Sequence, residues 1–243
     1  MTVTAKPVPI LSDNYAWLLK DEETGAVALV DPAVAEPCSA AVHGAGGRLD
    51  LILLTHHHDD HILGTDALRN EFGCQVLGAR ADLRRLPVLD RALIENDLVE
   101  LGTARGRVID TPGHTRGHIA FHFAEGGVLA CGDTLFSLGC GRLIEGSAEE
   151  MFASLAKLTA LPDDTLVCCG HEYTEQNGRF ALSVDPANPA LLRRMEEVRR
   201  LRAAGLPTLP ARLAEERAAN PFLRAASAAD FARLRAAKDV FRG

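Results

Sequence analysis

The chain has 243 residues, a net charge of −7, 47% hydrophobic residues and 24% charged residues, which is an ordinary globular composition. The acidic charge argues against a general nucleic-acid binder, and no apolar run approaches the roughly 20 residues that span a bilayer. The first residues lack the basic start and apolar segment of a signal peptide, and the six cysteines include no C-x-x-C pair. We therefore expect a cytoplasmic protein with reduced thiols and no membrane or nucleic-acid partner.

Up to about residue 172 the pattern predicts short β-strands, because brief apolar runs end in glycine, aspartate or proline turns. These runs occupy residues 26–30, 51–54, 74–78, 107–109, 127–131 and 165–169. Ser147 and Glu150 form a capping-box pattern ahead of a predicted helix that includes residues 151–158.

After about residue 173 the composition becomes helical. Asn188 followed by a proline predicts the start of a helix that runs to Leu201 and ends near Gly205. Ser227 is expected to cap a last helix that runs to Val240. The sequence thus divides into a strand-rich region, 1–172, and a helical region, 173–243.

The run of polar residues that follows the predicted strand at 51–54 is the strongest functional signal. His56 and His58 are two residues apart, so in an extended segment they face the same way. Asp60 and His61 follow where the chain must turn, and they can face a second ion. Imidazole and carboxylate concentrated at one strand end indicate binding of more than one metal ion.

Within the same run, His57 should point away from the first pair, and Asp59 is expected to be a non-ligand. Three other histidines, His43, His118 and His122, are interpreted as packed or solvated imidazoles. Of these, His118 could hydrogen-bond near the site.

Further metal-competent residues, His114, Asp133 and His171, follow later predicted strands. Taken singly, they could be a turn histidine, a turn cap and a surface histidine. Together with the first cluster they make seven candidate ligands, more than the four of a structural zinc, which fits two metals that share a carboxylate. Separate strands would deliver these ligands to one edge of a sheet.

Residues 55–61 resemble the H-x-H-x-D-H signature of the metallo-β-lactamase superfamily. Over nearly the whole chain, further segments resemble the glyoxalase II branch, the hydroxyacylglutathione hydrolases. These segments are 13–15, 132–136, 139–142, 170–174, 220–224 and 235–239.

The resemblance implies a four-layered αβ/βα sandwich with a small helical C-terminal domain that completes the substrate site. It implies two divalent metal ions, zinc first, with iron or manganese as alternatives. One ion would be bound by His56, His58 and His114, the other by Asp60, His61 and His171, with Asp133 between them. Asp60 and Asp133 would hold a metal-bound hydroxide that attacks the substrate.

The implied substrate is an S-(2-hydroxyacyl)glutathione such as S-D-lactoylglutathione, cleaved to glutathione and D-lactate in the second step of methylglyoxal detoxification. We expect the protein to be a monomer. The residues that match the substrate contacts of the family are Arg142, Tyr173, Arg235 and Lys238. Without the resemblance, the last two would be interpreted as a solvated helix face. Ile144 stands where the family often has an aromatic residue, so a hydroxyl contact to glutathione would be missing.

Three alternatives remain open. A nuclease of the same superfamily is disfavoured by the acidic charge. A persulfide dioxygenase with one iron is disfavoured by His61 and His171, which would bind a second ion. A scaffold protein with an inactive site is disfavoured because all seven ligand positions are filled.

Overall fold

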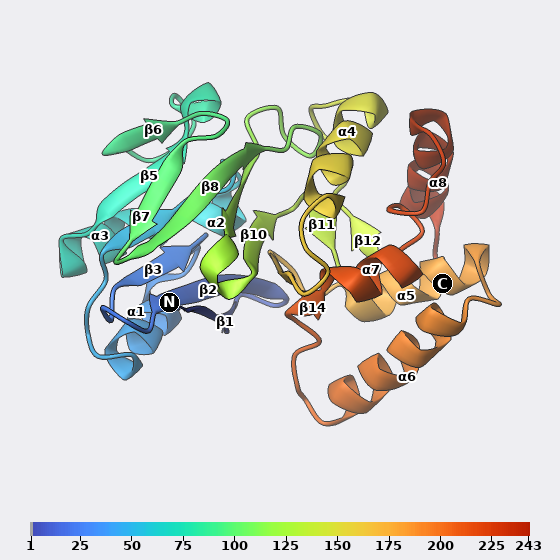
Figure 1. The fold of residues 1–243 in the computed structure, drawn as a ribbon, viewed down its shortest axis with the longest axis horizontal. Coiled ribbons are helices and arrows are strands. Elements are labelled where there is room, and N and C mark those ends of the chain that lie inside the picture. The colour runs from blue at the N-terminus through green and yellow to red at the C-terminus, as the bar shows by residue number, and fades with distance from the viewer. Residues whose placement is uncertain (1) are drawn as a thin grey trace.

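The computed structural model describes residues 2–243 and consists of two six-stranded sheets packed face to face, with helices on their outer sides (Figure 1). The first sheet contains β1 (Val3–Ile10), β2 (Asn14–Asp21), β3 (Val27–Val30), β4 (Leu51–Leu53), β5 (Gln75–Ala79) and β6 (Arg91–Leu93), in that order. The second has the order β14 (Ala211–Arg212), β13 (Leu166–Cys169), β10 (Val128–Gly132), β9 (Ile119–Phe123), β8 (Ala104–Asp110) and β7 (Leu98–Leu101). A small hairpin, β11 (Leu135–Phe136) and β12 (Gly139–Cys140), follows β10.

The helices complete the layers. Those of the first region are α1 (Ala35–Gly44), α2 (Asp59–Ile62), α3 (Thr65–Phe72) and α4 (Ala148–Thr159), with short 3-10 turns η1 (Arg80–Asp82) and η2 (Ala124–Gly126). Those of the second are α5 (Thr174–Val184), α6 (Pro189–Ala203), α7 (Leu213–Ala219) and α8 (Ala228–Val240). The C-terminal helices gather at one end of the molecule, and the predicted αβ/βα sandwich with a helical C-terminal part is confirmed (Figure 1).

Strand β2 shows how the sequence builds two cores. Tyr15, Trp17 and Leu19 are buried in the core between the sheets, whereas Ala16 and Leu18 pack in a second core with α1 and α3. The alternation follows from the two-residue period of a strand. Because both faces of β2 are covered, it has a nearly continuous apolar sequence.

All six predicted strand segments lie on strands of the structure, but eight other strands among the described residues were not predicted. The first of these, β1, contains Pro7 and Pro9, which argue against a strand. Because β1 is at the edge of its sheet, its missing N–H groups cost no ladder hydrogen bond on the open side. Tertiary position therefore overrides the local signal here.

The predicted helix caps are confirmed. Ser147 and Glu150 form a reciprocal capping box at the start of α4. The Asn188 side chain accepts from the first N–H groups of α6, and Ser227 Oγ accepts from the Asp230 N–H at the start of α8. These caps satisfy N–H groups that a helix start otherwise leaves unpaired.

The C-terminal region also contributes a strand, which its helical composition did not predict. β14 pairs antiparallel with β13, so residues from both regions share the second sheet.

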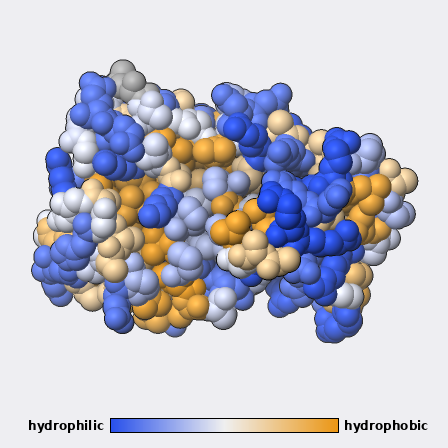
Figure 2. All heavy atoms as spheres, turned by 90° about the horizontal axis from the view of Figure 1, so that it is seen from below, coloured by the Kyte–Doolittle hydropathy of each residue, from blue (hydrophilic) through white to orange (hydrophobic). Residues whose placement is uncertain are grey.

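Seen from below Figure 1, the end of the molecule formed by the C-terminal helices is mostly hydrophilic, in keeping with exposed arginines on α6 such as Arg193, Arg199 and Arg200 (Figure 2). Among residues 2–243, no helix is both long and apolar enough to cross a membrane. All six cysteines are buried free thiols, as predicted.

Candidate metal centre and substrate pocket

Five of the seven candidate ligands lie in segments that follow strands, but those strands belong to both sheets, and Asp60 and His61 lie on the short helix α2. His56 and His58 follow β4 of the first sheet, whereas His114, Asp133 and His171 follow β8, β10 and β13 of the second. The prediction that one sheet edge supplies all ligands was therefore wrong. The ligand pattern did not show which sheet each strand joins. Because the two sheets pack face to face, these strand ends lie along a common rim of the sandwich.

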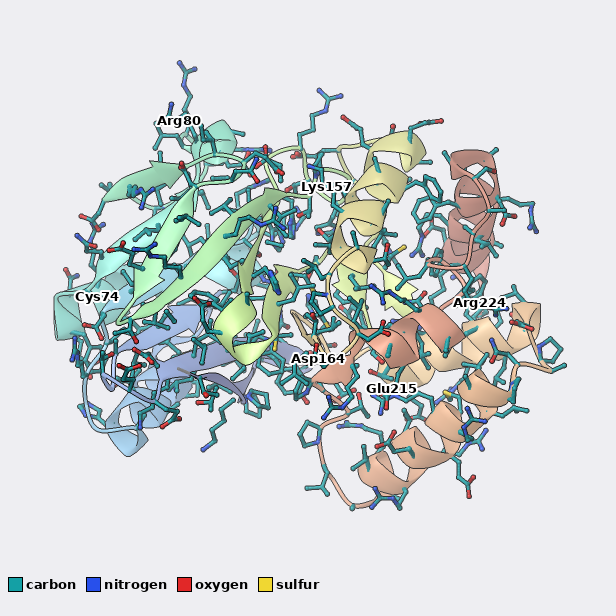
Figure 3. All side chains as sticks on the ribbon, viewed as in Figure 1. Cys74, Arg80, Lys157, Asp164, Glu215 and Arg224 are labelled. Atoms are coloured by element: carbon teal, nitrogen blue, oxygen red, sulfur yellow. The ribbon has the colours of Figure 1, made fainter. Side chains whose placement is uncertain are left out.

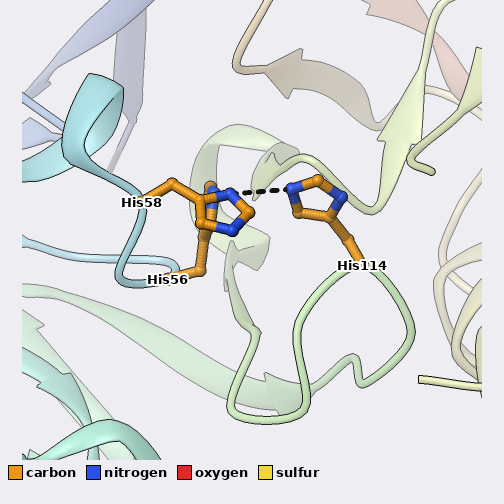
Figure 4. A group of neighbouring side chains, drawn as sticks. All are labelled: His56, His58 and His114. Carbon is orange, nitrogen blue, oxygen red and sulfur yellow. Dashed lines mark hydrogen bonds between the residues drawn. The ribbon is translucent and has the colours of Figure 1, made fainter. Parts of the chain in front are cut away.

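The first group of ring nitrogens converges closely. His58 Nδ1 lies 3.1 Å from His56 Nε2 and 3.1 Å from His114 Nε2 (Figure 4). The three residues form a compact group with the geometry of a metal site. We call His56, His58 and His114 the first trio.

The second trio consists of Asp60, His61 and His171. Asp60 Oδ2 lies 3.7 Å from His61 Nε2 and 3.6 Å from His171 Nε2. The Asp133 carboxylate lies between the two trios: its Oδ1 is 3.5 Å from His61 Nε2, and its Oδ2 is 3.5 Å from His114 Nε2. One carboxylate thus faces both groups.

These residues fit a pair of divalent cations. Among the described residues, His61 Nε2 and Asp133 Oδ1 are buried side-chain atoms without a hydrogen-bond partner, and both point into the centre. Leaving such atoms unpaired is costly unless something else satisfies them. Two ligand atoms bound to one zinc at about 2.1 Å lie roughly 3.4 Å apart in a tetrahedral site, close to the separations seen here.

Asp31 holds one side of the centre from behind. This buried carboxylate accepts from the Thr55 N–H at 2.8 Å and from Thr55 Oγ1 at 2.6 Å, and it lies 3.1 Å from His61 Nδ1. Thr55 Oγ1 in turn lies 3.0 Å from His56 Nδ1. Each outer ring nitrogen therefore has a partner, which fixes the ring and leaves the inner nitrogen for a metal.

Three further ligands are supported in the same way. His171 Nδ1 lies 3.0 Å from Asp13 Oδ1, and Asn14 Nδ2 donates to Asp60 Oδ2 at 2.9 Å. His114 Nδ1 lies 2.9 Å from the Arg142 carbonyl oxygen, which can only accept, so that nitrogen carries the proton. Only the inner nitrogen of His114 then has a free lone pair.

Two glycines make room for this packing. A Cβ on Gly170 would lie 2.5 Å from Asp133 Oδ1 and 2.7 Å from His61 Cε1. A Cβ on Gly132 would lie 2.3 Å from Thr55 Oγ1, and its φ of +46° also favours glycine. The close approach of the two sheets at the centre thus depends on these two positions.

The surroundings set the protonation of the two trios differently. Burial, and next the neighbouring imidazoles, lower the pKa values of His56 and His58. Burial alone would also lower the pKa of His61, but Asp133 and Asp31 outweigh it and raise that pKa to about 9. Asp133 likewise raises the pKa of His171 against the effect of burial. The imidazoles with carboxylate partners are the more basic ones.

The structure accounts for the residues around the cluster. His57 points away from the first trio, as predicted, and its Nδ1 lies 3.0 Å from Asp82 Oδ2. Asp59 is exposed. His118 is buried, and its Nε2 accepts from the Asp133 N–H at 3.1 Å, so it supports the centre, which the sequence left open. Asp31 was missed as a supporting residue, because an aspartate after a predicted strand commonly only caps a turn.

The four predicted substrate residues line one cavity of about 360 Å³, together with His114 and Asp133. Lys238 Nζ lies 5.5 Å from the centre of the Phe180 ring and donates to the Gln176 carbonyl at 3.3 Å. Burial, and next the nearby guanidinium of Arg235, lower the pKa of Lys238 to about 8. Tyr173 stacks on His171 with 4.6 Å between ring centres. The cavity therefore joins the candidate centre to a cationic wall.

Two of the pocket residues differ from a simple substrate contact. Arg235 is 4% exposed and donates to the Cys140 carbonyl at 3.0 Å and to Asp239 at 2.8 Å. One donor thus fixes α8 to β12, and two others pair with Asp239 one turn along the same helix. Ile144 is 58% exposed on the loop after Arg142, so it presents an apolar side chain there.

The sandwich with a histidine and aspartate cluster at its rim defines a member of the metallo-β-lactamase superfamily, and the model of that superfamily matches residues 11–171. The model of the hydroxyacylglutathione hydrolase C-terminus matches residues 172–241. The chain belongs to the hydroxyacylglutathione hydrolase family. It is 58% identical to the hydroxyacylglutathione hydrolase of Acidiphilium cryptum over 98% of this chain and 97% of that protein.

Solved structures share the fold. The crystal structure of ETHE1 from Myxococcus xanthus is 25% identical, with a TM-score of 0.74 over 100% of this chain and 93% of that one. The crystal structure of TTHA1623 in a di-iron-bound form is 30% identical, with a TM-score of 0.61 over 68% of this chain and 91% of that one.

Proposed function

We propose that the chain hydrolyses the thioester bond of S-(2-hydroxyacyl)glutathione, with S-D-lactoylglutathione as the first substrate to test. The observation that carries the proposal is the shared cavity. Its wall includes two candidate metal-facing residues, His114 and Asp133, and the two cations Arg142 and Lys238. A molecule bound by its carboxylates to the cations would reach the centre with its acyl end.

We assign the ions to the two trios, with Asp133 bridging them. Two divalent cations there would act as Lewis acids, lowering the pKa of water and stabilising charge on the carbonyl oxygen. Imidazole and carboxylate ligands suit zinc, iron and manganese alike. We propose zinc first, and the di-iron form of the 30% identical structure supports iron as the main alternative.

The chain's own residues provide the rest of the reaction. Asp60 and Asp133 face the centre with carboxylate oxygens that can accept hydrogen bonds from the attacking water and orient it. Asn14 donates to Asp60 and keeps that carboxylate directed inward. The glutathione thiol, with a normal pKa near 8.5, leaves without the acid that an amine would need.

The substrate wall belongs to both regions of the chain. We propose a catalytic domain, 1–172, that supplies Arg142, and a helical domain, 173–243, that supplies Tyr173, Lys238 and the supporting Arg235. The separate family matches at 11–171 and 172–241 agree with this division. The monomeric state and cytoplasmic location expected from the sequence stay predictions, to be tested by sedimentation and by fractionation.

The test is hydrolysis of S-D-lactoylglutathione by purified protein before and after removal of metal by a chelator. Activity should disappear with the metal and return when zinc, iron or manganese is added back. Parallel assays with single-stranded RNA and with glutathione persulfide test the nuclease and the dioxygenase. Oxygen consumption with the persulfide and no thioester cleavage would contradict the proposal.

A further inference from the structure

Beside the centre, four ionisable side chains from three separate segments form one connected network. They are His57, between two candidate ligands; Asp82 and Arg85, at and just after η1; and Glu145, on the loop after Arg142. The Asp82 carboxylate is 1% exposed and contacts both His57 and Arg85. Arg85 then ion-pairs with Glu145, which also lies 3.6 Å from His57 Nε2.

The loop at 142–146 is joined to this network through Glu145 and contacts the candidate ligand His114 through Arg142. Glu145 Oε2 accepts from the Arg116 N–H at 2.8 Å, and the Glu145 carbonyl accepts from Arg116 Nε at 3.2 Å. The Ile144 and Glu145 N–H groups donate to the His114 carbonyl at 3.3 Å, and the Arg142 carbonyl accepts from His114 Nδ1. The loop therefore wraps around His114, the third member of the first trio.

The network also reaches the other two members of that trio. His57 lies between His56 and His58 in sequence, so holding its ring on Asp82 fixes the backbone that presents both neighbours. No described acidic residue outside the network pairs with Arg85. The same ionic connection thus spans from the His56–His58 segment to the loop that orients His114 and carries Arg142.

We infer that Arg85 and Glu145 form a clasp that positions the first trio and the Arg142 side of the substrate pocket together. They are positioning residues, because neither lines the cavity nor contacts an inner ligand atom of the candidate ions. The inference deepens the proposed function, on which its substrate part rests. Residues that orient metal ligands affect metal affinity by about 10–100-fold.

The test uses Glu145→Gln and Arg85→Met, which remove the charge and keep approximate size. Each should lower the affinity for one of two zinc ions about tenfold or more in chelator competition, while the other ion keeps its wild-type affinity. Each should also raise KM for S-D-lactoylglutathione, because Arg142 moves with the loop. The double variant should lose no more than the stronger single variant, since either change opens the same clasp.

The matched control is Arg217→Met. Arg217 is 34% exposed, against 40% for Arg85, and it also joins two segments, pairing with Asp163 and the end of α4. It lies where the segment around Asp164 meets α7, which carries Glu215 (Figure 3). It should change thermal stability without changing metal affinity.

The conservative variants Glu145→Asp and Arg85→Lys cover the case in which a charge-removing variant fails to fold. They should show the same selective loss of one ion in weaker form. Wild-type metal affinity and KM in the single variants, or an equal loss in Arg217→Met, would overturn the clasp. Because metal affinity is measured without substrate, its result stands even if the wild-type protein does not cleave the thioester.

Discussion

The metal centre and the cationic pocket share His114 and Asp133, yet they are built differently. In the centre, ligands have second partners that hold them; His61 on α2, for example, has the buried Asp31. In the pocket, Lys238 comes from a helix and has a backbone carbonyl and two aromatic rings as neighbours. Among residues 2–243, Arg142 has no ion-pair partner. The centre is thus preorganised by the sheets, whereas the pocket depends on how α8 is placed.

This difference predicts that substitutions in the centre and substitutions in the pocket change different measured quantities. Changes at the centre should lower metal content and kcat, because they disturb atoms that are fixed before substrate arrives. Changes in the pocket should raise KM and leave the metals in place, because the cations there are free to meet an anion.

The largest effect is expected from Asp133→Ala. This change removes the one carboxylate that faces both trios, so both ions should bind weakly. Activity should fall by more than the roughly 10²–10³-fold that loss of a single oxyanion donor costs. Metal analysis and turnover measure it, with Asp164→Ala, an exposed carboxylate before β13 (Figure 3), as the control. Retention of two tightly bound ions would show that Asp133 does not bridge.

The next largest loss of metal affinity is expected from Asp31→Asn. This change keeps the size of the side chain but removes the charge behind His61, at a position where the backbone φ is +51°. Asparagine tolerates that backbone conformation, so the fold should survive. The affinity for one ion should fall about 10–100-fold. Asp50→Asn is the control, because Asp50 accepts from the Val27 N–H at the opposite end of the sheet. Equal metal loss in both variants would mean that general destabilisation, not His61, is responsible.

Much of the centre could be predicted because ligand chemistry leaves a local signature. His56, His58, Asp60 and His61 are close in sequence, and strand-end position marked His114, Asp133 and His171. The supporting residues lack such a signature. An aspartate after a strand, as at Asp31, commonly only caps a turn, and its role appears only once two strands are neighbours.

The fold, like the centre, could be predicted only where the signal is local in sequence. Continuous apolar runs such as β3 and β4 are visible because their burial is complete on both faces. By contrast β14, with two residues, exists only because β13 offers it an open edge. Likewise, the sequence placed Arg235 on a helix face, but its burial against Cys140 arises from the docking of α8.

On the pocket side, Lys238→Ala should raise KM for S-D-lactoylglutathione about tenfold or more, the value of one hydrogen bond between charged groups. Metal content should stay at the wild-type level, since Lys238 contacts no candidate ligand. Steady-state kinetics and metal analysis test this together. Arg233→Ala, on the exposed side of the same helix, is the control. An unchanged KM would indicate a different thiol or ester.

The smallest effect concerns pH and uses the same residue. Burial and the neighbouring guanidinium of Arg235 place the pKa of Lys238 at about 8, below its ordinary value, so its charge is present below that pH and is lost above it. If the cation binds a substrate carboxylate, kcat/KM should fall about twofold between pH 7 and pH 8 on this account alone. In Lys238→Arg the guanidinium stays charged, so this fall should disappear while any change due to the metal centre remains. The difference between the two pH profiles isolates the pocket from the centre. Identical profiles would place the titrating group elsewhere and weaken the distinction between the two regions.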